Sequence, residues 1–437
     1  MNFPLNRPRS LTALLFVATA SLMAACTSLE GSSPAGTAPT PTTGWTHQFG
    51  TDDEDGASFV AVDTQGNVLV GGWTNGMLGE TPNRGSYDGF VRKLRPDGLE
   101  AWTLQLGSEG EDAVEGVMAG SDGRVYVAGR VAGVLPGQMD AGEGDAFAMV
   151  LTGEGDAIWT RQFGTAKLDW GESVAIDSQG NVLVSGSTAG AFPGQTGAST
   201  ADNYTRKFDS AGNVLWTDQI GSQEGNGATT VVVDDRDNVY LVGSTLGPLP
   251  GTTHTGSGDV FVRKYDSAGA VLWTHEYGTN DGDAAIGAVV DTAGNLLIVG
   301  ATRGTWDGQA RFGGFLDAFL LKVSPAGELL MTVQFGTTSS DMASGVAVDA
   351  AGNIYIAGRT DGRFEGSRNR GATDAFVAKF NTQGEPLWTT QFGSPAEDYA
   401  FGVAVDGSGT VYAVGMGHLG VSEASALPDA WVVQLKQ

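Results

Sequence analysis

A tryptophan that recurs at a fixed distance is the strongest constraint on the fold of this chain. The interval is 57 residues, apart from one step of 58 residues, and a methionine takes the place of tryptophan once. The series is Trp45, Trp102, Trp159, Trp216, Trp273, Met331 and Trp388. A repeat of this length with several β-rich runs in each unit is typical of a β-propeller, in which each unit forms one blade.

Four apolar runs make up each unit, and we name them a, b, c and d in chain order. In one unit they are "SGVAVD" (344–349), "NIYIAGRT" (353–360), "DAFVAKF" (374–380) and "LWTTQFG" (387–393). Short turns such as "DTQGN" and "DSAGN" join a to b and c to d, and their fixed glycine suits a tight hairpin that needs positive φ. The units therefore predict blades of four antiparallel strands.

The first run of the series, "GWTHQFG" (44–50), is a d strand without a, b and c before it, and "DAWVVQL" (429–435) is a c strand. We therefore predict an all-β, seven-bladed propeller over residues 44–437. Six blades are continuous, and the seventh combines a, b and c from 399–435 with d from 45–50. Closure of this kind pairs distant segments in one sheet and leaves no blade edge open.

The repeated unit, with "W-T-x-Q-F-G", "G-V-A-V-D-x-x-G-N-V-Y-V-x-G" and "D-A-F-V-x-K", resembles the SBBP repeat of bacterial seven-bladed β-propellers. The second blade departs most, with Gly120 and Arg124 where other blades have Asp and Asn. The resemblance implies the propeller fold and an exported protein, and little about activity. "DSAGNVLWT" also resembles the tryptophan-docking pattern of quinoprotein propellers and of outer-membrane assembly lipoproteins.

The N-terminal segment indicates export. Arg7 and Arg9 precede an apolar run too short to span a membrane, as in a signal peptide, and "LMAAC" (22–26) resembles a lipobox. We expect a signal peptide at 1–25, lipidation of Cys26 and a flexible Ser/Thr/Pro-rich tether at 26–43. The alternative is a cleaved secretory signal with an incidental thiol. Thr27 favours the outer membrane of a bacterial envelope.

The overall charge excludes one class of partner. The formal net charge is −26, from 50 acidic and 24 basic residues, whereas nucleic-acid binding needs a basic surface. We expect no nucleic-acid partner and a monomeric ring.

The long b–c and d–a loops differ between blades, so we expect binding on the face that carries them, here called the variable face. The a–b and c–d turns lie on the opposite turn face. The b–c loops of blades five and six concentrate arginines and aromatic residues, a composition typical of interaction hot spots and carboxylate sites. The alternative is solvated arginines paired with Asp307, Asp361 and Glu365. The predicted partner-binding residues are Arg303, Trp306, Arg311, Phe312, Arg363, Phe364, Arg368 and Arg370.

An acidic residue recurs in the d–a crossings. The series is Asp55, Asp112, Asp169, Asn226, Asp283, Asp341 and Asp398. A residue present in nearly every blade indicates a structural cap, and Ca²⁺ binding is the alternative because Ca²⁺ takes oxygen ligands. Asp53, Asp55, Asp281 and Asp283 are the candidate ligands, and we expect no other cofactor.

Catalytic motifs are absent from the sequence. His47, His254, His275 and His418 have no metal-ligand spacing, and there is no G-x-S-x-G, P-loop or Cys/His zinc set. The sequence therefore predicts a non-catalytic binding or scaffold propeller, anchored to the envelope, that contacts a protein or an anionic glycan. The alternative is a glycan-active or quinoprotein-like enzyme with a pocket at the ring axis.

Overall fold

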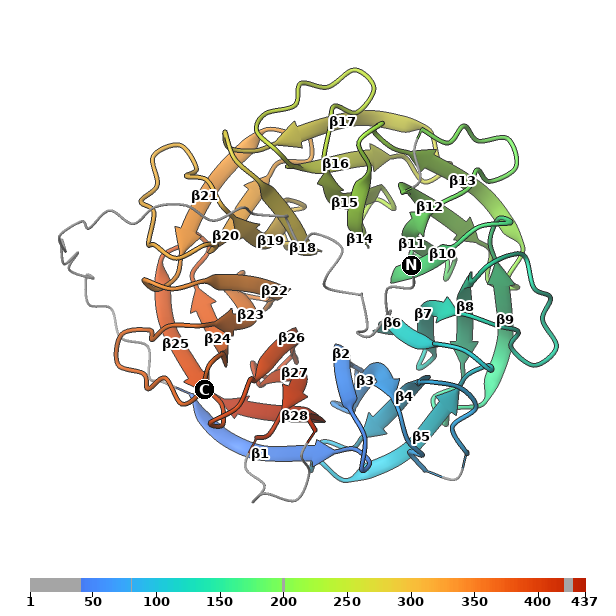
Figure 1. Cartoon of the computed structure of the whole chain (residues 1–437), viewed down its shortest axis with the longest axis horizontal. Coiled ribbons are helices and arrows are strands. Elements are labelled where there is room, and N and C mark those ends of the chain that lie inside the picture. Colours follow the sequence, from blue (N-terminus) through green and yellow to red (C-terminus); the bar gives the residue numbers. More distant parts are fainter. Residues whose placement is uncertain (1–40, 80, 199–200, 420–426) are drawn as a thin grey trace, which may run out of the picture.

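The computed structural model describes residues 41–79, 81–198, 201–419 and 427–437, and it confirms the predicted propeller. Seven four-stranded antiparallel sheets surround a central axis, each with strand a innermost and strand d at the rim (Figure 1). The predicted signal peptide 1–25, Cys26 and the tether up to residue 40 lie outside the described residues. In the part that is described, no helix has the length and apolar character to cross a membrane.

The 28 strands follow one another around the ring in chain order. Blades one to three consist of β2 (Asp55–Val62), β3 (Val68–Thr74), β4 (Asp88–Leu94), β5 (Glu100–Leu106), β6 (Ala113–Ala119), β7 (Val125–Val131), β8 (Asp145–Leu151), β9 (Ala157–Phe163), β10 (Asp169–Ile176), β11 (Val182–Thr188), β12 (Asp202–Phe208) and β13 (Val214–Ile220). Blades four to six consist of β14 (Asn226–Val233), β15 (Val239–Thr245), β16 (Asp259–Tyr265), β17 (Val271–Tyr277), β18 (Asp283–Val290), β19 (Leu296–Thr302), β20 (Asp317–Val323), β21 (Leu329–Phe335), β22 (Asp341–Val348), β23 (Ile354–Thr360), β24 (Asp374–Phe380) and β25 (Pro386–Phe392).

The seventh blade is split, as the sequence predicts. It contains β26 (Tyr399–Val405), β27 (Val411–Gly417), β28 (Asp429–Lys436) and β1 (Thr42–Phe49). Strand β1 pairs antiparallel with β28, with Phe49 opposite Ala430 and Gln48 opposite Trp431. The two ends of the described chain are therefore hydrogen-bonded in one sheet, which closes the ring.

The recurring tryptophans pack one blade onto the next. The indole Nε1 of Trp102 donates to the carbonyl of Gly153 in the following c–d turn at 3.0 Å, and Trp159 donates to Ser210 at 3.1 Å. The ring of Trp45 lies against Gly98, where φ is +84° and a Cβ would stand 2.9 Å from the indole. Glycine in this turn therefore serves both the backbone conformation and the docking.

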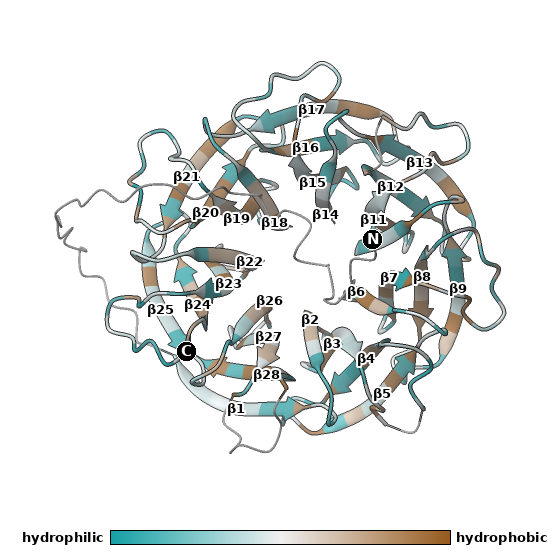
Figure 2. Ribbon diagram, in the orientation of Figure 1, coloured by the Kyte–Doolittle hydropathy of each residue, from teal (hydrophilic) through white to brown (hydrophobic). Residues whose placement is uncertain are grey.

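Apolar packing is distributed around the ring. Figure 2 shows apolar residues on the strands of every blade, and the buried clusters join neighbouring blades, as Trp388 of β25 does with Trp431 of β28. Near the axis the inner strands touch backbone to backbone, because a Cβ on Gly345 would lie 2.9 Å from the Phe401 carbonyl. Small residues on strand a therefore allow the inner strands to approach one another closely.

Candidate binding surface on the variable face

In blades one to six, the b–c loop begins at a fixed anchor on the rim strand of its blade. In blade one, Gln105 accepts a hydrogen bond from the Leu78 backbone N–H at 2.7 Å and donates to the Gly76 carbonyl at 3.0 Å and Asp88 at 2.9 Å. Four other blades repeat all three bonds, through Gln162, Gln219, Gln334 and Gln391. This anchor fixes the start of the loop and leaves its outer part exposed.

The anchor determines where two of the predicted aromatic residues lie. Trp306 and Phe364 occupy the place of Leu78, where the loop sends one apolar side chain back into the blade. Trp306 is only 5% exposed and packs edge-to-face on Phe319, and the partly buried Phe364 packs in the same way on Phe376. Their burial makes Trp306 and Phe364 part of the blade packing, so the prediction that Trp306 contacts a partner is wrong.

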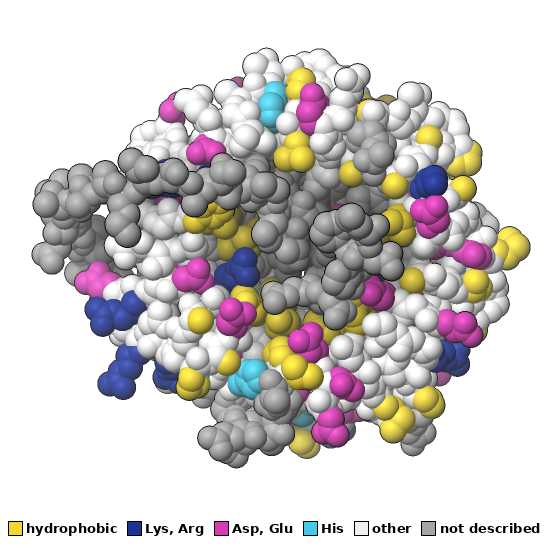
Figure 3. Space-filling view, in the orientation of Figure 1, with side chains coloured by type: hydrophobic (Ala, Val, Ile, Leu, Met, Phe, Trp, Pro, Cys, Tyr) yellow, Lys and Arg dark blue, Asp and Glu magenta, His cyan; other side chains and the backbone are white. Residues whose placement is uncertain are grey.

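The other predicted residues lie in the outer parts of the two loops. Arg311, Arg363, Arg368 and Arg370 are exposed, and Phe312 is 42% exposed. We call these five residues the basic patch. Lys and Arg side chains gather at the rim over the blade of β22–β25 in Figure 3.

The two loops of the basic patch meet the same d–a crossing. Phe315 of the blade-five loop donates its N–H to Ser340 Oγ at 3.2 Å. On the blade-six loop, a Cβ on Gly362 would lie 3.1 Å from Ser339 Cβ. The Phe312 and Arg370 amides also donate to aspartates that begin strands β20 and β24, at 3.0 and 2.8 Å. The backbone of the patch is therefore held, and its side chains project outward.

The basic patch is positively charged, whereas the chain as a whole has a net charge of −26. Across the described ranges, no carboxylate lies within 4.0 Å of the guanidinium groups of the basic patch. The pairing with Asp307, Asp361 and Glu365 that would have explained these arginines is therefore not formed. Arg303 differs, because it is half-buried, stacks on Phe315 at 4.8 Å and lies 4.0 Å from Asp281.

The acidic crossings form the structural caps that the sequence indicates. Asp55 and Asp283 are buried and accept hydrogen bonds from the backbone N–H four residues earlier, each at 2.6 Å. Burial raises the pKa of both carboxyls to about 6. Asp53 and Asp281 are exposed, and they do not join these buried carboxyls in a described cluster of three possible ligands. Calcium binding there stays a prediction.

A second polar cluster lies at the inner strands. The Arg130 guanidinium is 3.5 Å from Glu115 and 5.3 Å from the centre of the Trp170 ring. Glu115 is the extra residue of a β-bulge in β6, and burial raises its pKa to about 7. This cluster was not predicted from the sequence, because bulges cannot be located from the alternation of side chains alone.

The structure also brings a histidine without metal-ligand spacing in the sequence next to two carboxylates. His254 of the blade-four b–c loop lies beside Asp259 and Glu276, so the absence of a metal spacing in sequence did not mean an absence in space. The signal was present as a single exception, because glutamate occupies the place of the anchoring glutamine only in blade four.

Comparison with known proteins agrees with this architecture. Residues 44–79, 158–193 and 332–365 match the family model described as a beta-propeller repeat, SBBP. The regulatory protein FlaEY of Caulobacter vibrioides is 24% identical over 372 residues, which cover 73% of this chain and 38% of that protein. An uncharacterized WD repeat-containing protein of Acanthamoeba polyphaga mimivirus is 23% identical over 244 residues, which cover 45% of this chain and 18% of that protein. The chain thus spans less than two fifths of the curated relatives it matches.

Solved structures give more distant likenesses. A fungal alcohol oxidase of the AA5 family in complex with copper is 15% identical with a TM-score of 0.49, and covers 91% of this chain and 76% of its own. A protein of unknown function from Dyadobacter fermentans is 10% identical with a TM-score of 0.44, and covers 91% and 100%. Neither likeness bears on function. The chain is therefore a seven-bladed β-propeller, and three of its segments are similar to the SBBP beta-propeller repeat.

Proposed function

We propose that this propeller is a non-catalytic binding module of the bacterial envelope, anchored through Cys26, which captures an anionic partner on the basic patch. The observation that carries the proposal is a group of four exposed arginines without ion pairs in a chain of net charge −26. Arginine presents a planar fork of donors that matches carboxylates, and exposed Phe312 adds apolar contact area. The partner is an acidic protein surface or an anionic glycan.

Capture experiments with the full-length chain test this proposal. Envelope extract and an array of anionic and neutral glycans are probed in parallel, and a protein partner is identified by mass spectrometry. We expect Arg363→Glu, Arg368→Glu and Arg370→Glu together to abolish capture, because each replaces an attractive charge by a repulsive one. Capture should also weaken as salt concentration rises.

The control makes the same change of charge on the turn face. Arg95→Glu, Arg124→Glu and Arg236→Glu replace arginines of the a–b and c–d turns, so the net charge matches that of the first triple variant. Capture should survive this control. Equal loss in both variants would show an effect of total charge, and capture by a folded patch variant would contradict the proposal.

The cluster of Glu115, Arg130 and Trp170 on the inner strands favours a second candidate function, an enzyme that acts at the ring axis. A buried glutamic acid with a pKa near 7 can exchange a proton at neutral pH, as a general acid or base must. Turnover of a glycan that is lost in Glu115→Gln and retained in the patch triple variant would favour this enzyme over the binding module.

A further inference from the structure

Blade four breaks the glutamine anchor of the ring. In six blades a glutamine amide donates to the aspartate at the start of strand c: Gln48, Gln105, Gln162, Gln219, Gln334 and Gln391. Blade four has Glu276 at this place. Glu276 still accepts the loop hydrogen bond from the Leu249 amide at 2.8 Å, but an ionised carboxylate has no hydrogen to donate to Asp259.

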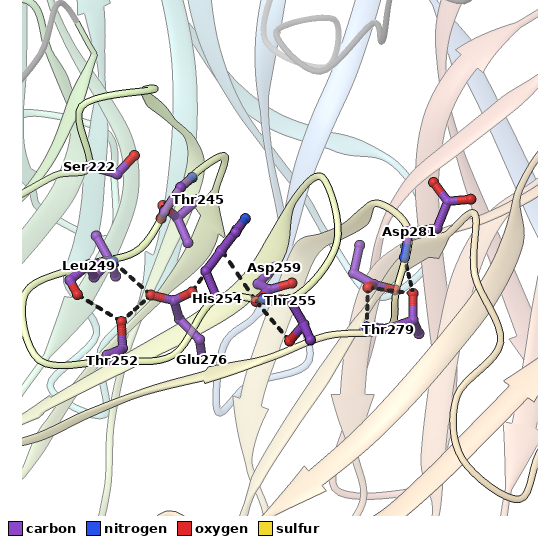
Figure 4. A network of polar contacts seen from close by, with 12 residues as sticks. Ser222, Thr245, Leu249, Thr252, His254, Thr255, Asp259, Glu276, Thr279 and Asp281 are labelled. Atoms are coloured by element: carbon purple, nitrogen blue, oxygen red, sulfur yellow. Dashed lines mark hydrogen bonds and ion pairs between the residues drawn. The ribbon is translucent and has the colours of Figure 1, made fainter.

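His254 occupies the gap between the two carboxylates. Its Nδ1 lies 2.9 Å from Glu276 Oε2 and 3.3 Å from Asp259 Oδ2 (Figure 4). Thr255 donates its backbone N–H to Asp259 Oδ2 at 2.6 Å, and the hydroxyl of Thr252 donates to the other Glu276 oxygen. The three side chains come from the b–c loop, from β16 and from β17, and they converge on one point.

The charge of this cluster is not balanced. The side chains of Asp259 and Glu276 are 0% exposed and that of His254 is 13% exposed. No Lys or Arg nitrogen of the described chain lies within 4.0 Å of either carboxylate. A buried carboxylate pair is costly unless cations compensate it, and a single imidazolium leaves one negative charge over. A divalent cation bound with a neutral imidazole brings the total to zero.

The distances also suit a metal ion. The three ligand atoms lie within 4.8 Å of one another. Zinc binds His nitrogen and carboxylate oxygen at about 2.0–2.2 Å, which places neighbouring ligands of a tetrahedron roughly 3.3 Å apart. The two measured contacts of 2.9 and 3.3 Å are close to this edge.

We propose that His254, Asp259 and Glu276 bind one divalent transition-metal cation of the Zn²⁺ class. The imidazole ligand favours such ions over Mg²⁺ and Ca²⁺, which prefer oxygen. In five of the other blades the three hydrogen bonds of the glutamine side chain tie the loop and strand c to the rim. In blade four the ion ties the same loop, through His254, to β16 and β17. It therefore rigidifies one sector of the variable face, and this site is separate from the basic patch.

Equilibrium dialysis of the full-length chain against Zn²⁺, followed by elemental analysis, tests the proposal. The wild type should retain one ion per chain that Glu276→Gln loses, with binding weakened about 100-fold or more. Glu276→Gln installs the residue that six blades already use, so it should fold, and circular dichroism checks this.

A matched control separates the site from general attraction of cations to an acidic chain. Gln219→Glu creates the same carboxylate pair with Asp202 in blade three, where Gly197 stands in the place of His254. It should gain no zinc. Co²⁺, whose visible absorption reports the number of ligands, should show a four-coordinate site in the wild type and none in His254→Asn. A wild type that retains no ion, or a Glu276→Gln variant that retains it fully, would overturn the proposal.

Discussion

Both faces of the ring carry buried or partly buried aspartates, but their pKa values are shifted in opposite directions. Blade six has one example on each face. On the turn face, burial alone would raise the pKa of Asp349, but hydrogen bonds from the side chain and backbone of Asn353 and from Tyr355 lower it. On the variable face, Asp341 is buried and caps the Thr337 amide, yet burial dominates and raises its pKa to about 6.

The difference follows from the number of donors around each carboxylate. The turn face supplies an amide side chain, two backbone N–H groups and in several blades a lysine, so the charged form is stabilised. On the variable face the cap aspartate faces the strand-c aspartate of the preceding blade, whose charge further disfavours ionisation. At neutral pH the charged form of the turn-face aspartate Asp349 is therefore stabilised, while that of the cap aspartate Asp341 on the variable face is disfavoured.

The largest contrast is expected from two lysines. Lys207 forms a 2.8 Å ion pair with Asp177 on the turn side, and both side chains are almost fully buried. Lys207→Ala should lower the free energy of unfolding by about 3 kcal/mol or more, because it leaves a buried carboxylate unpaired. Lys167 pairs with Glu143 on the variable face at 3.1 Å, with both side chains more than half exposed. Lys167→Ala should cost less than about 1 kcal/mol.

Denaturation with urea, monitored by tryptophan fluorescence, measures both variants. Equal losses of stability would contradict the expected difference between the two faces. A double variant, Lys207→Ala with Asp177→Asn, tests the cause of the loss. Removing the second charge should recover part of the loss in Lys207→Ala, because no charge is then left without its partner.

The next contrast concerns pH and uses two aspartates of one blade. The folded pKa of Asp341 lies above its ordinary value of 3.8, so its favourable contribution is present at low pH and is lost as pH rises through about 6. Asp341→Asn should therefore stabilise the ring at pH 8, by an upper limit of about 3 kcal/mol, and by roughly half as much at pH 5. Asn226, at the same register in blade four, indicates that asparagine fits.

Asp349→Asn should behave in the opposite way. Its folded pKa is lowered, so its contribution is present above the unfolded pKa and is lost only as pH falls below about 4. The variant should be destabilised at both pH 5 and pH 8. Urea unfolding at these two values tests the pair, and a gain of stability in Asp349→Asn at pH 8 would contradict the assignment of the faces.

The fold was predictable because the repeat is visible in the sequence. The interval of 57 residues, the glycine turns and the isolated d strand at 44–50 determine the number of blades and the closure, since each blade can bury its apolar faces only against neighbours. The docking of Trp45, Trp102, Trp159 and Trp273 on the next blade follows the same period. The N-terminal predictions around Cys26 stay predictions, because they concern residues outside the described structure.

The candidate site was predicted less well, because composition does not show exposure. Trp306 looked like an interface aromatic beside the arginines, although its register matches Leu249 and Leu78, which marks it as a buried residue. The replacement of the anchoring glutamine by Glu276 can also be seen in the aligned repeats. Its contact with His254 could not be predicted, because this contact depends on how a long loop returns across the blade.

The smallest expected effect on stability belongs to the residues with the largest expected effect on binding. Arg363→Ala, Arg368→Ala or Arg370→Ala alone should change the free energy of unfolding by less than about 0.5 kcal/mol, because these exposed side chains have no ion pair to lose. Arg92 provides the contrast, since it is buried over the Phe49 ring at 4.1 Å and bonded to Thr103. Arg92→Ala should lower the free energy of unfolding by more than about 1 kcal/mol, because it removes both the hydrogen bond to Thr103 and the packing on Phe49. If replacing a patch arginine lowered the free energy of unfolding as much as Arg92→Ala, that arginine would have a structural role. This result would contradict the assignment of the basic patch as the binding surface.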